Sequence, residues 1–281
     1  MAIRRTASPR QVTICLATLL CFAATAVRPQ WLNYRVPGVP RTADGKVNLA
    51  ASAPRAPDGK PDLSGTWESE YGYFNNLAKD LKTDEVVMQP WAKTKQAERT
   101  ANDNLPNLCL PPGVPHIDMS ARAEMPHPFK IVQTPSLVVL LYETSENSTF
   151  RQVFLDGRPL PKDPNPSWLG YSIGRWEGNT LVVETTGFNG RSLIDVGPGH
   201  PQSEEGHVTE RFTRRDFGHL EIDIKIDDPK AYIKPWSVKV PAHLLPDSDL
   251  IESYCENDAF PAFQVPEVAA RWRKVEFSEV S

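Results

Sequence analysis

Residues 219–227 read HLEIDIKID, and this stretch decides the fold class. A leucine and three isoleucines at even positions alternate with charged residues, so apolar and polar side chains point to opposite faces of an extended strand. One dry face and one wet face are typical of an antiparallel sheet that covers a core on one side. The stretch therefore predicts a β protein.

Strand-like stretches on both sides extend this pattern into a meander. HVTERFTRR (207–215) precedes it across a short turn, and GYSIGRW (170–176) is joined to TLVVETTGF (180–188) by a Gly-Asn hairpin signal. The other stretches of this kind are FKIVQ (129–133), LVVLLYE (137–143), TFRQVFL (149–155), PWSVKVPAHLL (235–245) and LIESYCEN (250–257), after a first strand at SGTWES (64–69). Because closure removes exposed sheet edges, we expect an all-β, antiparallel up-and-down barrel of about 8–10 strands.

One short helix is expected beside this barrel, over residues 90–102. Pro90 suits the first helical turn, and Trp91, Lys95 and Glu98 have helical spacing.

The first 26 residues have the pattern of an export signal. Arginines at 4, 5 and 10 precede an apolar run over 12–23, and Ala24-Thr25-Ala26 offers small residues for cleavage. A membrane-spanning helix needs about 20 apolar residues, and this run is shorter. We therefore expect no integral membrane segment after cleavage. We expect a periplasmic or extracellular location. The acidic chain, with a net charge of −4, carries no basic patch interleaved with aromatics, which argues against nucleic acid as a partner.

Two cysteines, Cys109 and Cys255, remain after cleavage of such a signal. In an oxidising compartment they predict one disulfide bond. The alternative is a soft metal site, since His116 and Met119 follow Cys109 closely. We expect the disulfide, no metal and no cofactor.

The proline-rich segment 27–62 and the residue after it contain nearly the same ten residues twice, as PRTADGKVNL (40–49) and PRAPDGKPDL (54–63). Each copy places an Asp-Gly turn signal after a proline. The segment is either a linker or a strap whose apolar residues lie against the fold, and we favour the strap. The expected organisation is thus a signal (1–26), a proline-rich strap (27–62) and a single barrel domain (63–281).

Two resemblances accompany these features. Gly65-Thr66-Trp67 resembles the Gly-x-Trp start of lipocalin-like (calycin-like) barrels, which implies that Trp67 closes one barrel end under an arginine such as Arg271 or Arg273. Nearly the whole chain is also similar to a family of exported bacterial proteins. The similarity is carried by QWLNYRVPGVPRTADGK, PDLSGTW, CLPPGVP, GRWEGNTLVVETTGFN, HVTERFTRRDFGHL and DDPKAYIKPW, and it implies no particular activity.

Charged residues among apolar strand neighbours are the candidates for chemistry. Glu210 lies between Val208 and Phe212, and Arg151 shares a strand face with Val153. Inside a barrel, both charges would need a partner, so they predict an internal ion pair; the alternative is a salt bridge on the outer face or rim.

A histidine-containing loop feeds the Glu210 strand. His200, Glu204 and His207 lie in GPGHPQSEEGHVTE. A histidine with a carboxylate partner is a general base near neutral pH, so Glu210, His207, Arg151 and His200 form a hypothetical catalytic set. Candidate ligand-binding residues near strand ends are His127, Glu143, Trp168, Tyr171 and Glu184.

These residues favour an exported barrel that binds a small, partly apolar molecule. A cofactor-independent acid–base enzyme (a lyase, isomerase or hydrolase) acting in the barrel mouth and a structural envelope protein remain the alternatives, so catalysis stays open.

Overall fold

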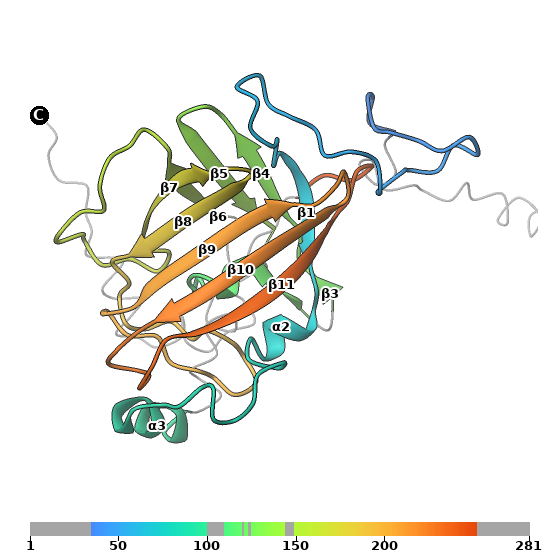
Figure 1. Cartoon of the computed structure of the whole chain (residues 1–281). Helices are drawn as coiled ribbons and strands as arrows, with labels where there is room; N and C mark the ends of the chain where they lie inside the picture. The colour runs from blue at the N-terminus through green and yellow to red at the C-terminus, as the bar shows by residue number, and fades with distance from the viewer. Residues whose placement is uncertain (1–34, 100–109, 120, 123–124, 144–148, 252–281) are drawn as a thin grey trace, which may run out of the picture.

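The computed structural model describes residues 35–99, 110–119, 121–122, 125–143 and 149–251. In this part of the chain nine strands close into a barrel in the order β1-β11-β10-β9-β8-β7-β6-β5-β4 (Figure 1). Their bounds are β1 Gly65–Ser69, β4 Phe129–Gln133, β5 Leu137–Tyr142, β6 Thr149–Phe154, β7 Tyr171–Glu177, β8 Thr180–Thr186, β9 His207–Arg214, β10 His219–Asp227 and β11 Trp236–Leu244. A small separate ladder joins β2 (Ala121–Arg122) to β3 (Met125–Pro126).

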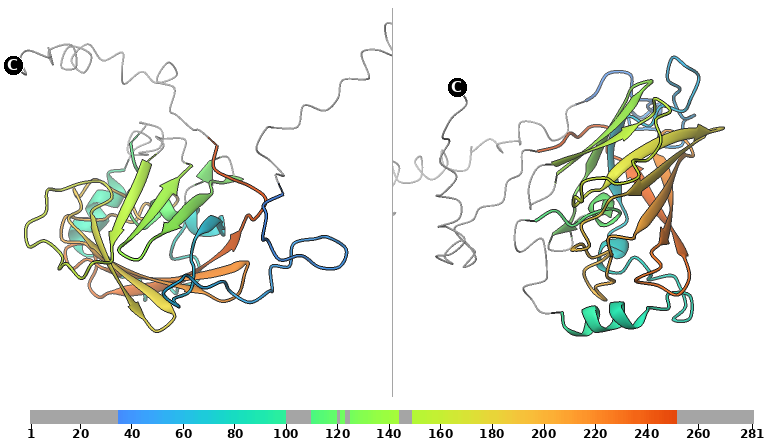
Figure 2. Two further views of the ribbon diagram at one scale, coloured as in Figure 1. Left: turned by 90° about the horizontal axis from the view of Figure 1, so that it is seen from above. Right: turned by 90° about the vertical axis from the view of Figure 1, so that its left-hand side faces the viewer.

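The first strand closes the barrel. Trp67 of β1 pairs with Leu244 of β11 on one side and with Phe129 of β4 on the other. Figure 2 shows the resulting curl, with the green strands β4 and β5 on one side of the interior and the orange strands β10 and β11 on the other. The expectation of a closed β-barrel from residues 207–227 and their neighbours is confirmed.

One strand pair departs from the expected antiparallel order. β6 and β7 run parallel, with Val153 opposite Ser172, because residues 155–170 carry the chain back to the other end of the barrel instead of forming a hairpin. The other eight neighbouring pairs of the barrel are antiparallel.

Alternation along the strands places the core inside the barrel. In β10 the four even-numbered apolar residues are buried, and β9 and β11 show the same strict alternation. Trp67, Phe129 and Phe212 are among the largest fully buried side chains. Burial of apolar surface at about 25 cal/mol per Å² makes this interior the main source of stability.

The helices are short. α3 (Pro90–Ala97) begins at the expected proline but ends before residue 102, because Glu98 already caps it. α2 (Gly72–Asn75) and the 3-10 helix η3 (His116–Met119) follow strand β1 and a proline-rich loop, respectively. α2 and η3 contact one another, and η3 also contacts β1.

The twin decapeptides form twin loops. Arg41 bridges to Val47 and Arg55 bridges to Pro61, each around a glycine with positive φ. The described part of the strap lies against the barrel: the backbone N–H groups of Phe217 and Gly218 donate to strap carbonyls at 2.7 and 2.8 Å.

Several expectations fall outside the described residues. These are the export signal (1–26), the start of the strap (27–34), the Cys109–Cys255 disulfide and the C-terminal part of the barrel domain (252–281), which includes Arg271 and Arg273.

Candidate functional site

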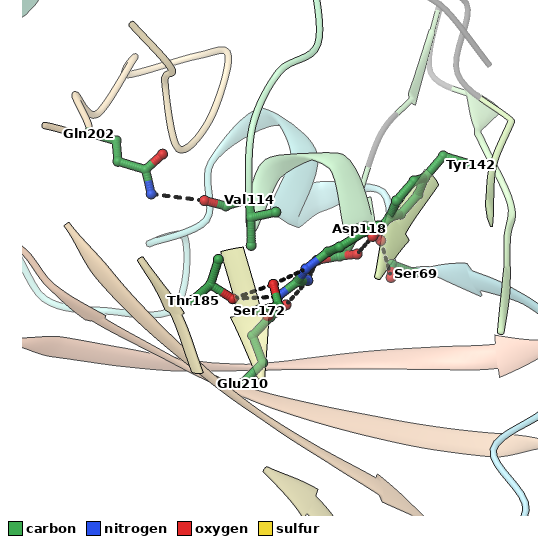
Figure 3. A network of polar contacts seen from close by, with 9 residues as sticks. Ser69, Val114, Asp118, Tyr142, Ser172, Thr185, Gln202 and Glu210 are labelled. Atoms are coloured by element: carbon green, nitrogen blue, oxygen red, sulfur yellow. Dashed lines mark hydrogen bonds and ion pairs between the residues drawn. The ribbon is translucent and has the colours of Figure 1, made fainter. Parts of the chain in front are cut away.

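Seven polar residues meet inside the barrel, and six of them come from strands (Figure 3). Arg151 of β6 lies at the centre, with 2 % of its side chain exposed. Its partners come from β7, β8, β9 and η3, and the full set is Ser69, Asp118, Tyr142, Arg151, Ser172, Thr185 and Glu210, which we call the ionic core. The pairing of Arg151 with Glu210, inferred from the strand pattern, is therefore present.

The hydrogen bonds of Arg151 account for all five of its N–H donors. Nε donates to Ser172 at 3.0 Å. Nη1 donates to Asp118 at 3.3 Å and to Glu210 at 3.2 Å, while Nη2 donates to Thr185 at 2.7 Å and to the other oxygen of Glu210. Because each donor already has an acceptor, the ionic core is a closed network rather than a set of groups that await a ligand.

Two carboxyl groups share this one guanidinium. Burial raises the pKa of Asp118 well above its usual range, and the negative charge of Glu210 raises it further, against the effect of Arg151. Tyr142 donates to Asp118 at 2.6 Å, and burial also raises the pKa of this phenol. A proton retained on Asp118 leaves the ionic core neutral, which a fully buried site requires.

The raised pKa of Asp118 predicts a pH dependence of stability. Above the unfolded-state pKa near 4, the folded protein holds a proton that the unfolded chain releases, so the free energy of unfolding falls as pH rises, by up to about 1.4 kcal/mol per pH unit. Asp118→Asn should remove this slope in urea-unfolding experiments between pH 4 and 7. Asp84→Asn, on an exposed loop, is the control. Identical slopes for wild type and Asp118→Asn would contradict this assignment.

The interior next to the ionic core is filled by side chains. Eight apolar residues, among them Leu63, Leu140 and Phe212, surround a space that leaves no volume for a water molecule. Small barrels are commonly filled in this way. This region of the interior has no room for a ligand.

A groove lies outside the barrel, between the strap and the barrel end that contains Trp67. It has a volume of about 480 Å³, within the range of small-molecule sites. The strap contributes residues 36–39 and Pro54, and the barrel contributes Phe217, Leu244 and Arg214. We call this space the strap groove.

Arg214 lies over Trp67, where the lipocalin-like resemblance implies an arginine. Its guanidinium lies 4.9 Å from the ring centroid of Trp67 and 5.4 Å from that of Phe217. Among the described residues, the cation over Trp67 comes from the last residue of β9, whereas Arg271 and Arg273 lie outside the described residues.

The two candidate histidines do not join the ionic core. His207 begins β9 on the outside, with its Nε2 3.8 Å from Glu184. His200 lies in a second cluster, where its Nδ1 contacts Asp195 at 2.6 Å and its ring lies 5.9 Å from that of Trp236. Asp195 is fully buried and also accepts three backbone N–H groups. A histidine oriented by a buried carboxylate has the arrangement of a general base.

The candidate ligand-binding residues are dispersed. Glu184 lies on the outer face of β8, where it accepts from Arg175 at 2.6 Å, because its neighbour Thr185 faces inward. Glu143 lies just beyond β5 and accepts from the backbone of Ile251.

Trp168 and Tyr171 have described contacts outside the ionic core. Tyr171 stacks on Phe154 and accepts from Arg158 at 3.1 Å. Trp168 lies under Arg191 at 4.9 Å, and His127 is half-buried just before β4. In the described contacts, Glu143, Glu184, Trp168 and Tyr171 share no side-chain partner with one another.

No family model and no curated protein matches the chain. The described residues contain no helix that is both long and apolar enough to span a bilayer.

Proposed function

We propose that this protein is an exported binding protein that holds a small, partly apolar molecule in the strap groove. The volume of about 480 Å³ is the observation that carries the proposal, because the adjoining interior is filled and the ionic core is closed. The export signal expected at residues 1–26 supports binding in the periplasm or outside the cell.

The composition of the groove supports a ligand with an apolar body. The strap provides apolar surface through Val36 and Val39. The adjacent barrel end provides it through Phe217 and Leu244. Ligand sites typically combine such surface with a few polar groups that fix orientation. Here the polar groups include Arg214 and the ion pair of Lys130 with Asp249, in which Nζ and Oδ1 lie 2.8 Å apart.

Filling the groove should weaken binding without unfolding the barrel. Val39→Trp places a large side chain in the groove from the strap, and we expect it to weaken binding of the uncharged fluorescent probe N-phenyl-1-naphthylamine at least tenfold, about 1.4 kcal/mol. Ile233→Trp is the matched control, since Ile233 is 62 % exposed and lies outside the groove lining. Fluorescence titration provides the dissociation constants. Equal affinity in the wild type and in Val39→Trp would refute the groove as the binding site.

A further inference from the structure

We propose that the ligand of the strap groove is an amphipathic organic anion whose negative group lies against Arg214. This inference rests on the proposed function, because it names the chemical class of the molecule that the same groove takes.

Arg214 is a buried cation without a contacting carboxylate. It is 6 % exposed, and within the described part of the chain none of its ion-pair or hydrogen-bond partners is a carboxylate. Its hydrogen bonds go to backbone carbonyl oxygens of Asp62, Ser64, Asp216 and Phe217. Carbonyl oxygens satisfy the donors but do not neutralise the charge, and buried charges in proteins are normally paired.

The hydrogen-bond count leaves room for one more acceptor. Nε donates to Asp216, Nη1 donates to Asp62 and Ser64, and Nη2 donates to Phe217, so these bonds account for four of the five N–H groups. The remaining N–H is on Nη2. Burial lowers the pKa of Arg214 to about 10, which still leaves the guanidinium protonated near neutral pH.

The other charged residues of the groove are already engaged. Lys130 holds Asp249 through both carboxylate oxygens, at 2.8 and 2.9 Å. The carboxylate of Asp62 accepts the backbone N–H of Ser64 at 2.9 Å and acts on Arg214 without a hydrogen bond to it; only the backbone carbonyl of Asp62 contacts Arg214. The carboxylate of Asp216, outside the groove lining, contacts His219 at 2.7 Å and likewise acts on Arg214 without a hydrogen bond to it. A ligand anion is therefore the group that would supply Arg214 with a direct counter-charge.

The rest of the groove fits the apolar part of such a molecule. Residues 36–39 and Pro54 form the strap side, and Phe217 and Leu244 form the barrel side. Figure 1 shows the strap, in blue, next to the ends of β9 to β11 that this groove adjoins. An aromatic or aliphatic acid would place its hydrocarbon part between these two walls and its anionic group at Arg214.

A matched pair of probes tests the charge preference. 8-Anilinonaphthalene-1-sulfonate and N-phenyl-1-naphthylamine share one ring system and differ by a sulfonate. We expect the wild-type protein to bind the sulfonate at least about tenfold more tightly, because a charge-assisted hydrogen bond is stronger than a neutral contact. Arg214→Gln should reduce this ratio to about one, whereas Arg215→Gln, at an exposed neighbouring position paired with Glu221, should keep it.

A second measurement covers the case in which Arg214→Gln does not fold. The Nε–H resonance of Arg214 in the wild-type protein should shift on addition of the sulfonate and remain in place with the uncharged probe. Equal affinities for both probes, each lost in Val39→Trp, would overturn the anion inference and leave the groove as the binding site. Binding of both probes that is insensitive to Val39→Trp would overturn the proposed function itself.

Discussion

Replacing Arg151 with methionine should lower the free energy of unfolding by about 3–5 kcal/mol. The substitution leaves Asp118 and Glu210, both with fully buried side chains, without the cation that holds them. Urea unfolding monitored by tryptophan fluorescence measures the change. Arg175→Met is the matched control, because Arg175 pairs with Glu184 and Glu177 while 54 % of its side chain is exposed, and such surface pairs contribute at most about 1 kcal/mol.

A double variant separates the loss of the ion pair from the loss of packing. Arg151→Met combined with Glu210→Leu also removes the carboxylate that has lost its cation, while Asp118 keeps its proton, so we expect the double variant to be more stable than Arg151→Met alone. If Arg151→Met instead unfolds within about 1 kcal/mol of the wild type, the ionic core is not the closed and buried network described above.

Truncating Trp67 to alanine should have a comparable effect, about 3–5 kcal/mol. The indole is fully buried, donates from Nε1 to the carbonyl of Leu63 at 2.9 Å and supports the guanidinium of Arg214. Its removal leaves a cavity at the barrel end and withdraws the aromatic face from a buried cation. Denaturant unfolding of Phe150→Ala is the comparison, since Phe150 is 58 % exposed and should change stability by no more than about 0.5 kcal/mol. A Trp67→Ala protein as stable as Phe150→Ala would mean that Trp67 does not close this end.

The barrel could be predicted because several strands alternate strictly. In β9 and β10 every second residue is buried, so the period of two in HVTERFTR and HLEIDIKID identifies the inner face directly. The same rule places Glu210 inside. It also places Arg214 inside, four residues further along β9, so a strict application of the alternation would have identified the cation over Trp67.

Other parts of the site could not be read from the pattern. In LVVLLYE and TLVVETT apolar residues occupy both faces of the strand, so the pattern does not indicate which positions point inward. The structure places Tyr142 and Thr185 inside and Glu184 outside. Asp118 lies in η3, after a proline-rich loop with no periodicity, and only tertiary packing brings it to Arg151. The strap groove is likewise made by segments far apart in the chain.

A crystal structure with a brominated aromatic carboxylate would locate the ligand most directly, because the bromine position is identified by its anomalous scattering. We predict one peak between residues 36–39 and Leu244, with the carboxylate next to Arg214. A peak inside the barrel beside Arg151, or bound ligand elsewhere with the strap groove empty, would contradict the claim that this barrel binds its ligand on the outside.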